Sequence, residues 1–371
     1  MSKKYRVLGL MSGSSLDGLD LVFCEIEAAD EPDFTVTHSE ILVAETVPFS
    51  EQWQVRLKNL PEQNALTFAK TNTYFAHYTA DLVRGFCIKN KVKPDFIAAH
   101  GHTIFHQPEN FLTVQIGDGA ALAAKTGYPV VCDFRTHDVA LHGEGTPLAP
   151  AADRWLYPGY DFYLNLGGIA NISCKVDDSF VAFDTAPANQ VLNALANLTG
   201  AEYDANGALA DAGQVDTDLL NAVNTLPYFS EKYPKSLDNS WIKNQVLPLY
   251  FSAEISLKDK IRTAVEQTAG QTAVELKRVT VRENISQENR KMLVTGGGAF
   301  NGFLIKRLRA LCENTEIVLP SDLIINFKEA ALMALLGVLR VENQPNCYAS
   351  VTGAKYDSVG GAIYQGRKKI I

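Results

Sequence analysis

The 371-residue chain lacks several features that mark specialised classes of protein. It contains no run of about 18 or more apolar residues, so we predict no membrane-spanning helix. Residues 1–5 lead directly into a strand-like run and lack the apolar core and small-residue cleavage site of a signal peptide. No low-complexity stretch or long linker interrupts the chain. We therefore expect a cytoplasmic protein built from folded domains.

Cysteine is scarce and scattered, and no pair has the C-x-x-C spacing of a zinc or redox site. Most of the six cysteines lie in apolar strand-like or helix-like runs, namely Cys24, Cys87, Cys132, Cys174, Cys312 and Cys347. This usage is typical of reduced, buried thiols in an intracellular protein. We expect neither disulfides nor a zinc site.

Positive charge is also in deficit, because 34 basic residues face 42 acidic ones, a formal net charge of −8. A chain with this balance is not expected to bind nucleic acid or a membrane surface through bulk electrostatics. Any anionic ligand must be held by backbone amides or by a few placed cations. Hydrophobic residues make up 46% of the chain, which is ordinary for globular domains, and the length suggests about two to three of them.

Strand and helix patterns alternate along the chain, and the opening pattern occurs twice. Strands are expected over residues 5–11 and 19–28, joined by a turn at 12–18. Two more, over 161–166 and 169–176, are joined by Gly167 and Gly168. This repeat at long spacing indicates a duplicated α/β domain. Further strands are expected over 34–47, 96–100, 129–134, 180–184, 292–294 and 317–319, and helices over 64–90, 119–125, 190–198, 257–277, 303–312 and 328–341.

Three glycine-rich loops are candidates for binding phosphate, at residues 12–18, 166–171 and 295–301. Glycine allows the backbone to aim several N–H groups at an anion, and serine hydroxyls add donors. The third loop follows a strand and opens a helix, whose N-terminus favours negative charge. The first loop matches neither the Walker A nor the dinucleotide pattern, and taken alone it would be a plain hairpin turn.

Asp184 is the best candidate for acid–base chemistry. It is expected to end the apolar strand at 180–183, and a carboxylate at a strand end is well placed to act as a general base. The alternative is that Asp184 caps the helix that begins near Gln190.

Other polar residues have two interpretations each. Residues 133–138 and 143–148 combine glycine with Arg135 and acidic residues, which suits either ligand contact or a structural group of ion pairs. Glu329 is expected near the start of its helix, where the helix dipole favours an acid in any case. Lys235 lies in a polar stretch that is expected to be a surface loop.

Histidines concentrate in one segment, where His100, His102 and His106 could suggest a metal site. Strand alternation puts His100 and His102 on one face, but no nearby cysteine or carboxylate completes a tetrahedral set. We expect ligand contact or structural hydrogen bonding rather than zinc.

Together these motifs resemble the anhydro-N-acetylmuramic acid kinase family over nearly the whole chain and in order. They are MSGSSLDGLD (11–20), HGHTIFHQP (100–108), QIGD (115–118), DFR (133–135) with Asp138, GEGTPL (143–148), NLGGIANI (165–172), FDTAPAN (183–189), DANG (204–207), GGGAFN (296–301) and KEA (328–330).

The resemblance implies an α/β protein with two ribonuclease-H-like domains of the actin/hexokinase type and a nucleotide cleft between them. The first domain would span residues 1–158, completed by 342–371, and the second 159–341. The helix over 328–341 would return the chain to the first domain. Residues 12–18 and 166–172 would be the two phosphate loops, and 296–301 would hold the adenosine.

The implied reaction uses ATP and Mg²⁺. Water opens the 1,6-anhydro ring of anhydro-N-acetylmuramic acid and the freed 6-oxygen takes the γ-phosphoryl group, giving N-acetylmuramic acid 6-phosphate for cell-wall recycling. Asp184 matches the catalytic aspartate, Asp17 is expected near the metal, and substrate contacts are expected from His102, Thr103, Arg135, Asp138 and Glu329. Nucleotide contacts are expected from Ser12, Gly13, Ser14, Ser15, Leu16, Asp17, Gly18, Leu19, Gly167, Gly168, Gly296, Gly297, Gly298 and Asn301.

The chain departs from the family pattern at three places. Ser14 stands where the family more often has threonine, Ala186 and Ala188 replace two glycines, and the usual Thr-Gly-Arg-Glu after Ser236 is absent. Two alternatives therefore stay open: a non-catalytic sugar or nucleotide sensor, and a kinase of another sugar, on the same fold. We expect a homodimer that binds an amino sugar and ATP, and neither nucleic acid nor membrane.

Overall fold

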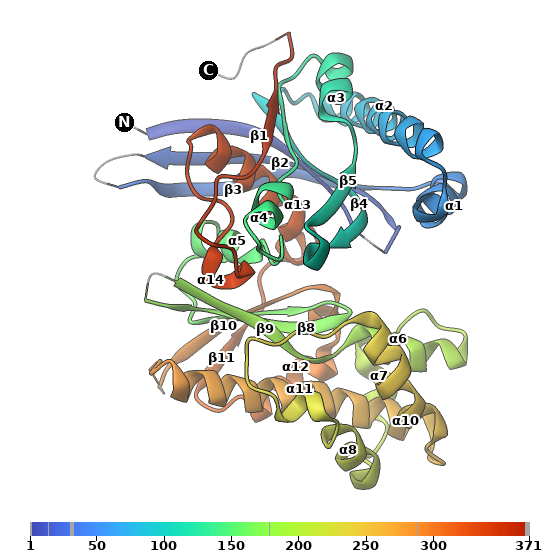
Figure 1. Ribbon diagram of the computed structural model, residues 1–371. Coiled ribbons are helices and arrows are strands. Elements are labelled where there is room, and N and C mark those ends of the chain that lie inside the picture. Colours follow the sequence, from blue (N-terminus) through green and yellow to red (C-terminus); the bar gives the residue numbers. More distant parts are fainter. Residues whose placement is uncertain (1, 14, 30–32, 178, 287, 368–371) are drawn as a thin grey trace. The chain divides into compact units, whose positions relative to one another are not determined.

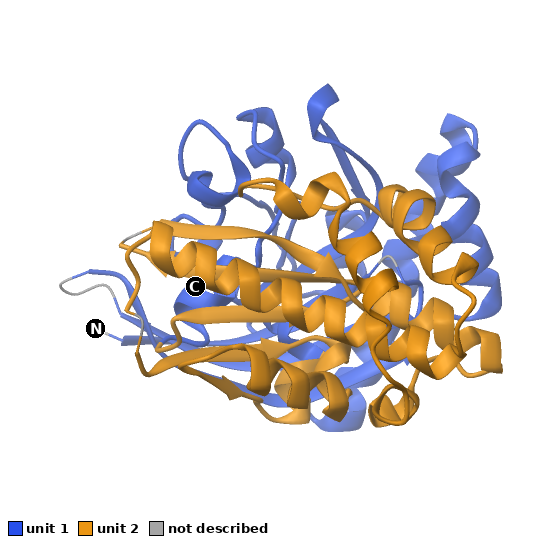
Figure 2. Cartoon of the chain, turned by 90° about the horizontal axis from the view of Figure 1, so that it is seen from below, with its two compact units in different colours: residues 1–158, 327–371 blue, residues 159–326 orange. Residues whose placement is uncertain are grey.

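The computed structural model describes residues 2–13, 15–29, 33–177, 179–286 and 288–367. The chain forms two compact units, shown in different colours in Figure 2. Unit 1 comprises residues 1–158 and 327–371, and unit 2 comprises residues 159–326. Residues 327–341 group with unit 1, whereas the sequence analysis counted them in the second domain.

Unit 1 is built on a seven-stranded sheet with the order β12-β6-β4-β1-β2-β3, and β5 pairs with β4 at one end (Figure 1). The pairs β1–β2 and β2–β3 are antiparallel, whereas β1–β4 and β4–β6 are parallel. The strands are β1 (Ser2–Ser12), β2 (Gly18–Ala29), β3 (Thr35–Pro48), β4 (Phe96–Gln107), β5 (Leu112–Ile116), β6 (Val130–Cys132) and β12 (Ala362–Tyr364).

The helices of unit 1 pack on both faces of this sheet, because each face carries its own cluster of buried apolar side chains. The chain supplies α1 (Glu51–Asn59), α2 (Ala65–Asn90), α3 (Gly119–Thr126), α4 (Thr136–Ala140), α5 (Ala149–Trp155), α13 (Asp322–Val341, in unit 1 from Phe327) and α14 (Ala349–Thr352). Short 3₁₀ turns lie at Leu60–Glu62 and Pro108–Asn110.

Unit 2 repeats the same topology with five strands in the order β11-β10-β7-β8-β9. Along the chain, its first three strands pair antiparallel with one another, as β1, β2 and β3 do in unit 1. Its fourth and fifth strands run parallel to the first, as β4 and β6 do in unit 1. The strands are β7 (Phe162–Leu166), β8 (Ile169–Val176), β9 (Ser179–Pro187), β10 (Arg290–Thr295) and β11 (Thr315–Val318). Strand order and direction thus confirm the duplication that the sequence indicated.

Unit 2 places a larger set of helices around its sheet. They are α6 (Asn189–Ala196), α7 (Ala208–Asp211), α8 (Thr217–Asn224), α9 (Asn239–Trp241), α10 (Leu247–Ser252), α11 (Leu257–Arg282) and α12 (Gly302–Leu311), with 3₁₀ turns at Asn197–Thr199, Ala205–Gly207, Pro227–Ser230 and Gly297–Phe300 and a π-helical turn at Ile242–Val246.

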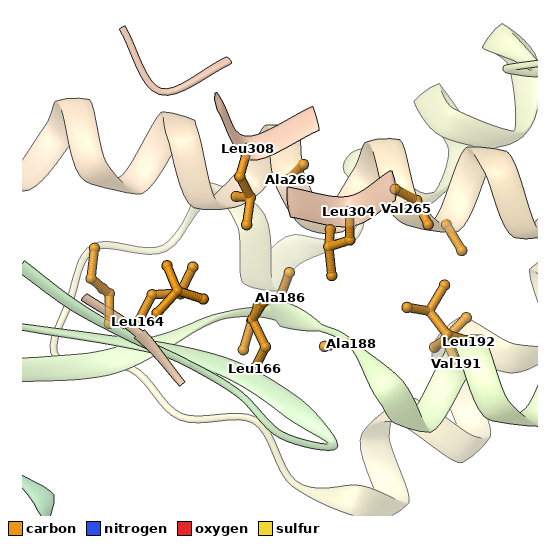
Figure 3. Packing of buried hydrophobic residues seen from close by; sticks show 14 of the residues in the cluster. Leu164, Leu166, Ala186, Ala188, Val191, Leu192, Val265, Ala269, Leu304 and Leu308 are labelled. Atoms are coloured by element: carbon orange, nitrogen blue, oxygen red, sulfur yellow. The ribbon is translucent and has the colours of Figure 1, made fainter. Parts of the chain in front are cut away.

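The core of unit 2 lies between the sheet and the helices α11 and α12 (Figure 3). Leu164 and Leu166 of β7 face Leu304 and Leu308 of α12, and all four side chains are fully buried. Alternate strand residues point to one face, so this burial fixes which side of β7 meets the helices. The end of the β7–β8 hairpin is thereby held in place by the core.

Three expected boundaries differ from the structure. Strand β9 continues to Pro187, so Asp184 lies within the strand rather than at its end. Helix α13 begins at Asp322, two turns before Glu329, so the interpretation of Glu329 as a first-turn acid is wrong. Strand β4 extends to Gln107 and carries the histidine-rich segment. Apolar runs mark buried parts of these elements, whereas their polar ends continue beyond the runs.

The helices formed by the described residues include none that is both long enough and apolar enough to cross a membrane.

Close packing of β1 against α13 makes Gly9 a sensitive position. A Cβ atom built on Gly9 would overlap the carbonyl oxygen of Ala330 in α13. We expect Gly9→Ala to lower the free energy of unfolding by about 1–3 kcal/mol, the usual cost of overpacking. A Cβ on Gly85, inside α2, meets open space, so Gly85→Ala should be neutral or raise stability by up to about 1 kcal/mol. Urea unfolding of both variants checks this, and equal effects would contradict the packing argument.

Candidate functional site

The first glycine loop connects β1 to β2. Ser12, at the end of β1, is buried, and its Oγ lies 2.8 Å from Nδ1 of His102. A Cβ on Gly13 would make an ordinary van der Waals contact with Ser15 Oγ at 3.6 Å. Asp17 and Ser15 are exposed. This part of the loop is open to an anionic ligand, whereas Ser14 lies outside the described residues.

The other residues of this loop serve the fold. The Leu16 N–H donates to the Gly13 carbonyl oxygen at 3.4 Å, and Leu16 has a positive φ of 62°. A Cβ on Gly18 would overlap the carbonyl oxygen of Val47, and the Leu19 side chain is buried in the core. Gly18 and Leu19 therefore position the loop, and the Leu19 side chain points away from any ligand there.

His100 and Arg135 form a buried contact that fixes the histidine tautomer. Arg135 Nε donates to His100 Nε2 at 2.8 Å, so Nδ1 carries the proton and can donate to the Gly101 carbonyl oxygen 3.1 Å away. Burial, with the Arg135 charge beside it, lowers the pKa of His100 to about 3. Arg135 also donates through Nη1 to the Gly145 carbonyl oxygen at 2.7 Å. His100 is a neutral hydrogen-bonding group of the interior.

His102 and Thr103 follow on the same strand. Burial lowers the pKa of His102 to about 4, so its ring is neutral when it contacts Ser12. The Thr103 hydroxyl accepts from Gln115 Nε2 at 3.3 Å. Within the described ranges, no three histidine, cysteine, aspartate or glutamate side chains gather as a metal-ligand set.

Asp138 is buried and bonded through both carboxylate oxygens. Oδ2 accepts from the Gly145 N–H at 2.8 Å, and Oδ1 accepts from the Thr352 hydroxyl at 2.8 Å. A Cβ on Gly143 would overlap this carboxylate. Asp138 therefore ties the glycine loop at 143–145 to α14, and its influence on a ligand can pass only through that loop.

Glu329 lies close to two other charged groups of unit 1. Its pKa is raised by desolvation and, to a lesser extent, by the charge of Asp20, whereas the charge of Arg135 lowers it. Desolvation likewise raises the pKa of Asp20, although the Thr46 hydroxyl donates to its Oδ1 at 2.6 Å. The sequence analysis passed over Asp20 as a site residue, although it pairs with Met11 across the strands that carry the first loop.

The two glycine segments of unit 2 lie against each other. A Cβ on Gly296, whose φ is +83°, would clash with Asn165 and the Leu166 backbone, and one on Gly298 would overlap the Leu166 side chain. A Cβ on Gly297 or Gly167 would make ordinary van der Waals contacts, with Asn189 Nδ2 at 3.8 Å and Asn165 Nδ2 at 3.4 Å. The structure thus places two segments about 130 residues apart in the sequence against each other.

Asn301 and the DANG segment brace this surface. Asn301 caps α12 by accepting the Leu304 N–H at 3.0 Å, and Asn206 accepts the Gly302 N–H at 3.1 Å. Asp204 accepts the N–H groups of Leu209 and Ala210. These polar side chains are occupied with shaping the loops.

Asp184 lies on β9, the edge strand of the unit 2 sheet, opposite Asn171 on β8. Its neighbour Thr185 is buried and contacts Thr272 of α11 at 3.2 Å. Thr185 is the extra residue of an irregularity in the β8–β9 pairing, between Asp184 opposite Asn171 and Ala186 opposite Ala170. Helix α6 begins at Asn189, with Ala188 at its N-cap position. The interpretation of Asp184 as a helix cap is therefore wrong.

The carboxylate of Asp184 is held by one loop. Its Oδ2 accepts the Leu237 N–H at 2.8 Å and the Ser236 hydroxyl at 3.1 Å. Burial raises the pKa of Asp184, while these two donors lower it. Oδ1 remains for other chemistry, because both of these bonds use Oδ2. A half-buried carboxylate with a raised pKa and a defined orientation suits a general base.

Lys235 is buried, which corrects the expectation of a surface loop. Its Nζ lies 3.0 Å from Glu275 Oε1 of α11, and the two side chains are 2% and 1% exposed. Its carbonyl oxygen accepts the Asp184 N–H at 3.2 Å. Sequence reasoning missed this role, and that of Ser236 and Leu237, because contacts between segments about 50 residues apart leave no local periodic signal.

Comparisons with known proteins cover nearly the whole chain. The family model described as anhydro-N-acetylmuramic acid kinase matches residues 5–366. Curated proteins of that name are similar to it: one from Sulfurovum sp. (strain NBC37-1) is 32% identical over 97% of this chain and 99% of the relative, and one from Pasteurella multocida is 32% identical over 98% and 97%. One from Coxiella burnetii is 33% identical over 98% and 99%.

Among solved structures, two align with this chain at low sequence identity. The activator of 2-hydroxyisocaproyl-CoA dehydratase from Clostridium difficile, with bound ADPNP, has a TM-score of 0.42 and 12% identity over 92% of this chain and 96% of that chain. Component A of (R)-2-hydroxyglutaryl-CoA dehydratase from Acidaminococcus fermentans has a TM-score of 0.39 and 13% identity over 89% and 96%.

The lowered pKa of His102 predicts a pH dependence of stability. The unfolded chain binds a proton near pH 6.5 and the folded chain only near pH 4, so stability is complete above pH 6.5 and falls as the pH drops toward 4. This shift corresponds to about 3 kcal/mol. We expect His102→Gln to flatten the fall in unfolding free energy between these pH values, whereas His38→Gln on exposed β3 should not. Identical pH profiles for all three proteins would contradict the assignment.

Proposed function

The chain belongs to the anhydro-N-acetylmuramic acid kinase family, and on that premise we propose how its residues perform the reaction. It is an ATP-dependent kinase that acts in cell-wall recycling. Its substrate is 1,6-anhydro-N-acetylmuramic acid, which it opens with water and phosphorylates on the 6-oxygen. The observation that supports this best is the carboxylate of Asp184, oriented by the loop at 235–237 and raised in pKa by burial.

The glycine loops fit the phosphates of ATP. The first loop has exposed Ser15 and Asp17 in unit 1, and in unit 2 the glycine segments at 167–168 and 296–298 lie against each other through Asn165 and Leu166. Backbone N–H groups in such turns bind anions without a lysine. We propose that residues 12–18 and 166–171 contact the phosphates and that residues 296–301 contact the adenosine.

A magnesium ion bound with ATP would supply charge neutralisation to the phosphoryl group. The exposed carboxylate of Asp17 suits this ion, because Mg²⁺ keeps several waters and takes few protein ligands. Asp17 beside the first phosphate loop is the residue proposed to hold it.

Asp184 has the central role in the proposed mechanism. As water attacks C1 of the sugar, its proton passes to the carboxylate and the C1–O6 bond breaks. The freed O6 then bonds to the γ-phosphorus while the bond from that phosphorus to the ADP oxygen breaks. Asp184 orients the water and accepts its proton. Its carboxylate keeps one orientation because Ser236 and Leu237 hold Oδ2.

We propose that residues of unit 1 complete the sugar site. Glu329 and Arg135 interact electrostatically and can contact polar groups of the substrate. His102 and Thr103 lie along β4 beside the first loop. Asp138 supports this site through the loop at 143–145.

The repeated strand order supports two ribonuclease-H-like domains of the actin/hexokinase type as the finer description of the fold. Each unit contributes one hairpin turn rich in glycine between its first two strands. We propose that these two turns bind the phosphates of one nucleotide.

Asp184→Asn tests the catalytic role. Asparagine can still accept the Leu237 N–H but is a poor proton acceptor, so turnover should fall about 10²–10⁴-fold while ATP binding is retained. Asp161→Asn is a matched control, because Asp161 also accepts a backbone N–H, that of Lys291, at 2.8 Å. ADP release and calorimetric ATP titration measure both properties. Turnover of Asp184→Asn equal to that of the control would remove the base assignment.

A substrate panel tests the reaction itself. We expect ADP release with 1,6-anhydro-N-acetylmuramic acid but not with N-acetylmuramic acid or N-acetylglucosamine, because only the anhydro sugar has the C1–O6 bond to open. EDTA should abolish activity and Mg²⁺ restore it. Sugar binding without ADP release would indicate a sensor, and turnover of another sugar would indicate a different kinase.

A further inference from the structure

We propose that the buried Lys235–Glu275 ion pair is a positioning device for Asp184, fixing the loop at 235–237 against the edge strand β9. This inference rests on the proposed function, because it assigns a purpose to contacts around the proposed base. Neither Lys235 nor Glu275 touches the Asp184 carboxylate. They act through the loop backbone and through Ser236.

A series of contacts connects helix α11 to the Asp184 carboxylate. Glu275 of α11 accepts Lys235 Nζ at 3.0 Å and Arg278 Nη1 at 2.6 Å through the same oxygen, Oε1. Lys235 Nζ also donates to the Tyr228 carbonyl oxygen at 3.2 Å and lies 4.5 Å from the centre of the Tyr228 ring. The lysine head is thus fixed by a charge, a carbonyl group and an aromatic face.

The same loop holds Asp184 at backbone and side chain. The Lys235 carbonyl oxygen accepts the Asp184 N–H, which on an edge strand faces no neighbouring strand of its sheet. The next two residues donate to Oδ2. The Tyr228 hydroxyl donates to the Asp184 carbonyl oxygen at 2.7 Å. A shift of Lys235 would therefore move or release the two donors to Oδ2 and the acceptor of the Asp184 N–H.

Other anchors flank Lys235 along the loop, and the ion pair lies between them. Tyr233 stacks on Phe183 of β9 with ring centres 4.6 Å apart, and its hydroxyl donates to Glu283 at 2.6 Å. These contacts hold the start of the loop, two residues before Lys235. Beyond Lys235, the Leu237 side chain is buried in the core of unit 2, so the ion pair is a charged anchor between two apolar ones.

A charged pair at this depth is costly to desolvate, and an apolar pair of the same volume would pack the loop at least as well. The charged pair fixes the direction of the Lys235 ammonium group, because the Glu275 carboxylate, the Tyr228 carbonyl group and the Tyr228 ring each constrain it. An apolar pair would not provide this constraint. This directional constraint is the property that a catalytic carboxylate held by the next two residues of the loop needs, since a displacement of about 1 Å can cost about 10²-fold in rate.

Several charged or titratable groups face this region. Tyr228, from the 3₁₀ turn, contacts Asp184 and is affected by Glu275 and Glu231, and burial raises its pKa. On the α11 side, Glu275 is flanked by Lys235 and Arg278. The two donors to Oδ2 favour the ionised form of Asp184. Loosening the loop should therefore raise the pH at which the base becomes active.

The test compares Lys235→Met and Glu275→Gln with a control on the same helix. Glu266→Gln removes a charge from α11 that pairs with Arg307 at 2.7 Å, nine residues from Glu275. Three quantities are measured: hydrogen exchange of peptides covering residues 235–238 in the free protein, kcat with KM for ATP, and the acid limb of kcat/KM against pH.

We expect both variants of the pair to speed exchange in residues 235–238, to lower kcat by up to about 10²-fold with KM for ATP unchanged, and to move the acid limb to higher pH. The control should change none of these. The proposal would be overturned if both variants kept the kcat and the acid limb of the parent. It would also be overturned if the control variant changed them as much as the pair variants do.

Two further outcomes are assigned in advance. Should Lys235→Met fail to fold by circular dichroism, Glu275→Gln decides alone, because glutamine keeps the shape and an oxygen acceptor for Lys235. Should the parent protein prove inactive on every sugar, the proposed function fails. Hydrogen exchange alone then tests whether the ion pair anchors the loop. Faster exchange in residues 235–238 of the pair variants would support the device, and unchanged exchange would overturn it.

Discussion

A carboxylate withdrawn from water must find hydrogen-bond donors, and the surroundings of Asp184 follow from this constraint. β9 is an edge strand, so its outer side has no sheet neighbour to supply them. The loop at 235–237 takes that place, with one carbonyl group for the Asp184 N–H and two donors for its carboxylate. The loop in turn needs an anchor, which Lys235 and Glu275 provide. Edge strand, loop and helix α11 are thus joined around one functional group.

The repeated topology explains why the glycine turns occur where they do. In each unit the first two strands form a hairpin, and the fourth strand along the chain, β4 or β10, runs parallel to the first. In unit 2 the hairpin turn and the end of the parallel strand β10 meet, which brings Leu166, next to Gly167, against Gly296 and Gly298. In unit 1 the corresponding strand β4 carries His102 to the buried Ser12 hydroxyl. The same sheet geometry thus brings the end of the parallel strand to the hairpin in both units.

Much of this was predictable because it depends on local patterns. Apolar periodicity indicated nearly all strands and long helices, glycine marked the hairpins, and the ordered motifs indicated the family that the chain-wide match confirms. The misjudged features depend on packing. A single apolar run cannot show that β9 continues to Pro187, that α13 starts at Asp322, or that Lys235 has an acid on a helix 40 residues away. Asp20 was passed over for a similar reason, since its proximity to Glu329 arises from tertiary structure.

The most direct measurement of the central claim is a crystal structure with 1,6-anhydro-N-acetylmuramic acid and a non-hydrolysable ATP analogue bound together. The account predicts a water on C1 of the sugar, about 2.6–3.2 Å from the free oxygen of Asp184, with Oδ2 still bonded to Ser236 and Leu237. A sugar whose C1 lies beyond reach of Asp184, even through one water, would contradict it.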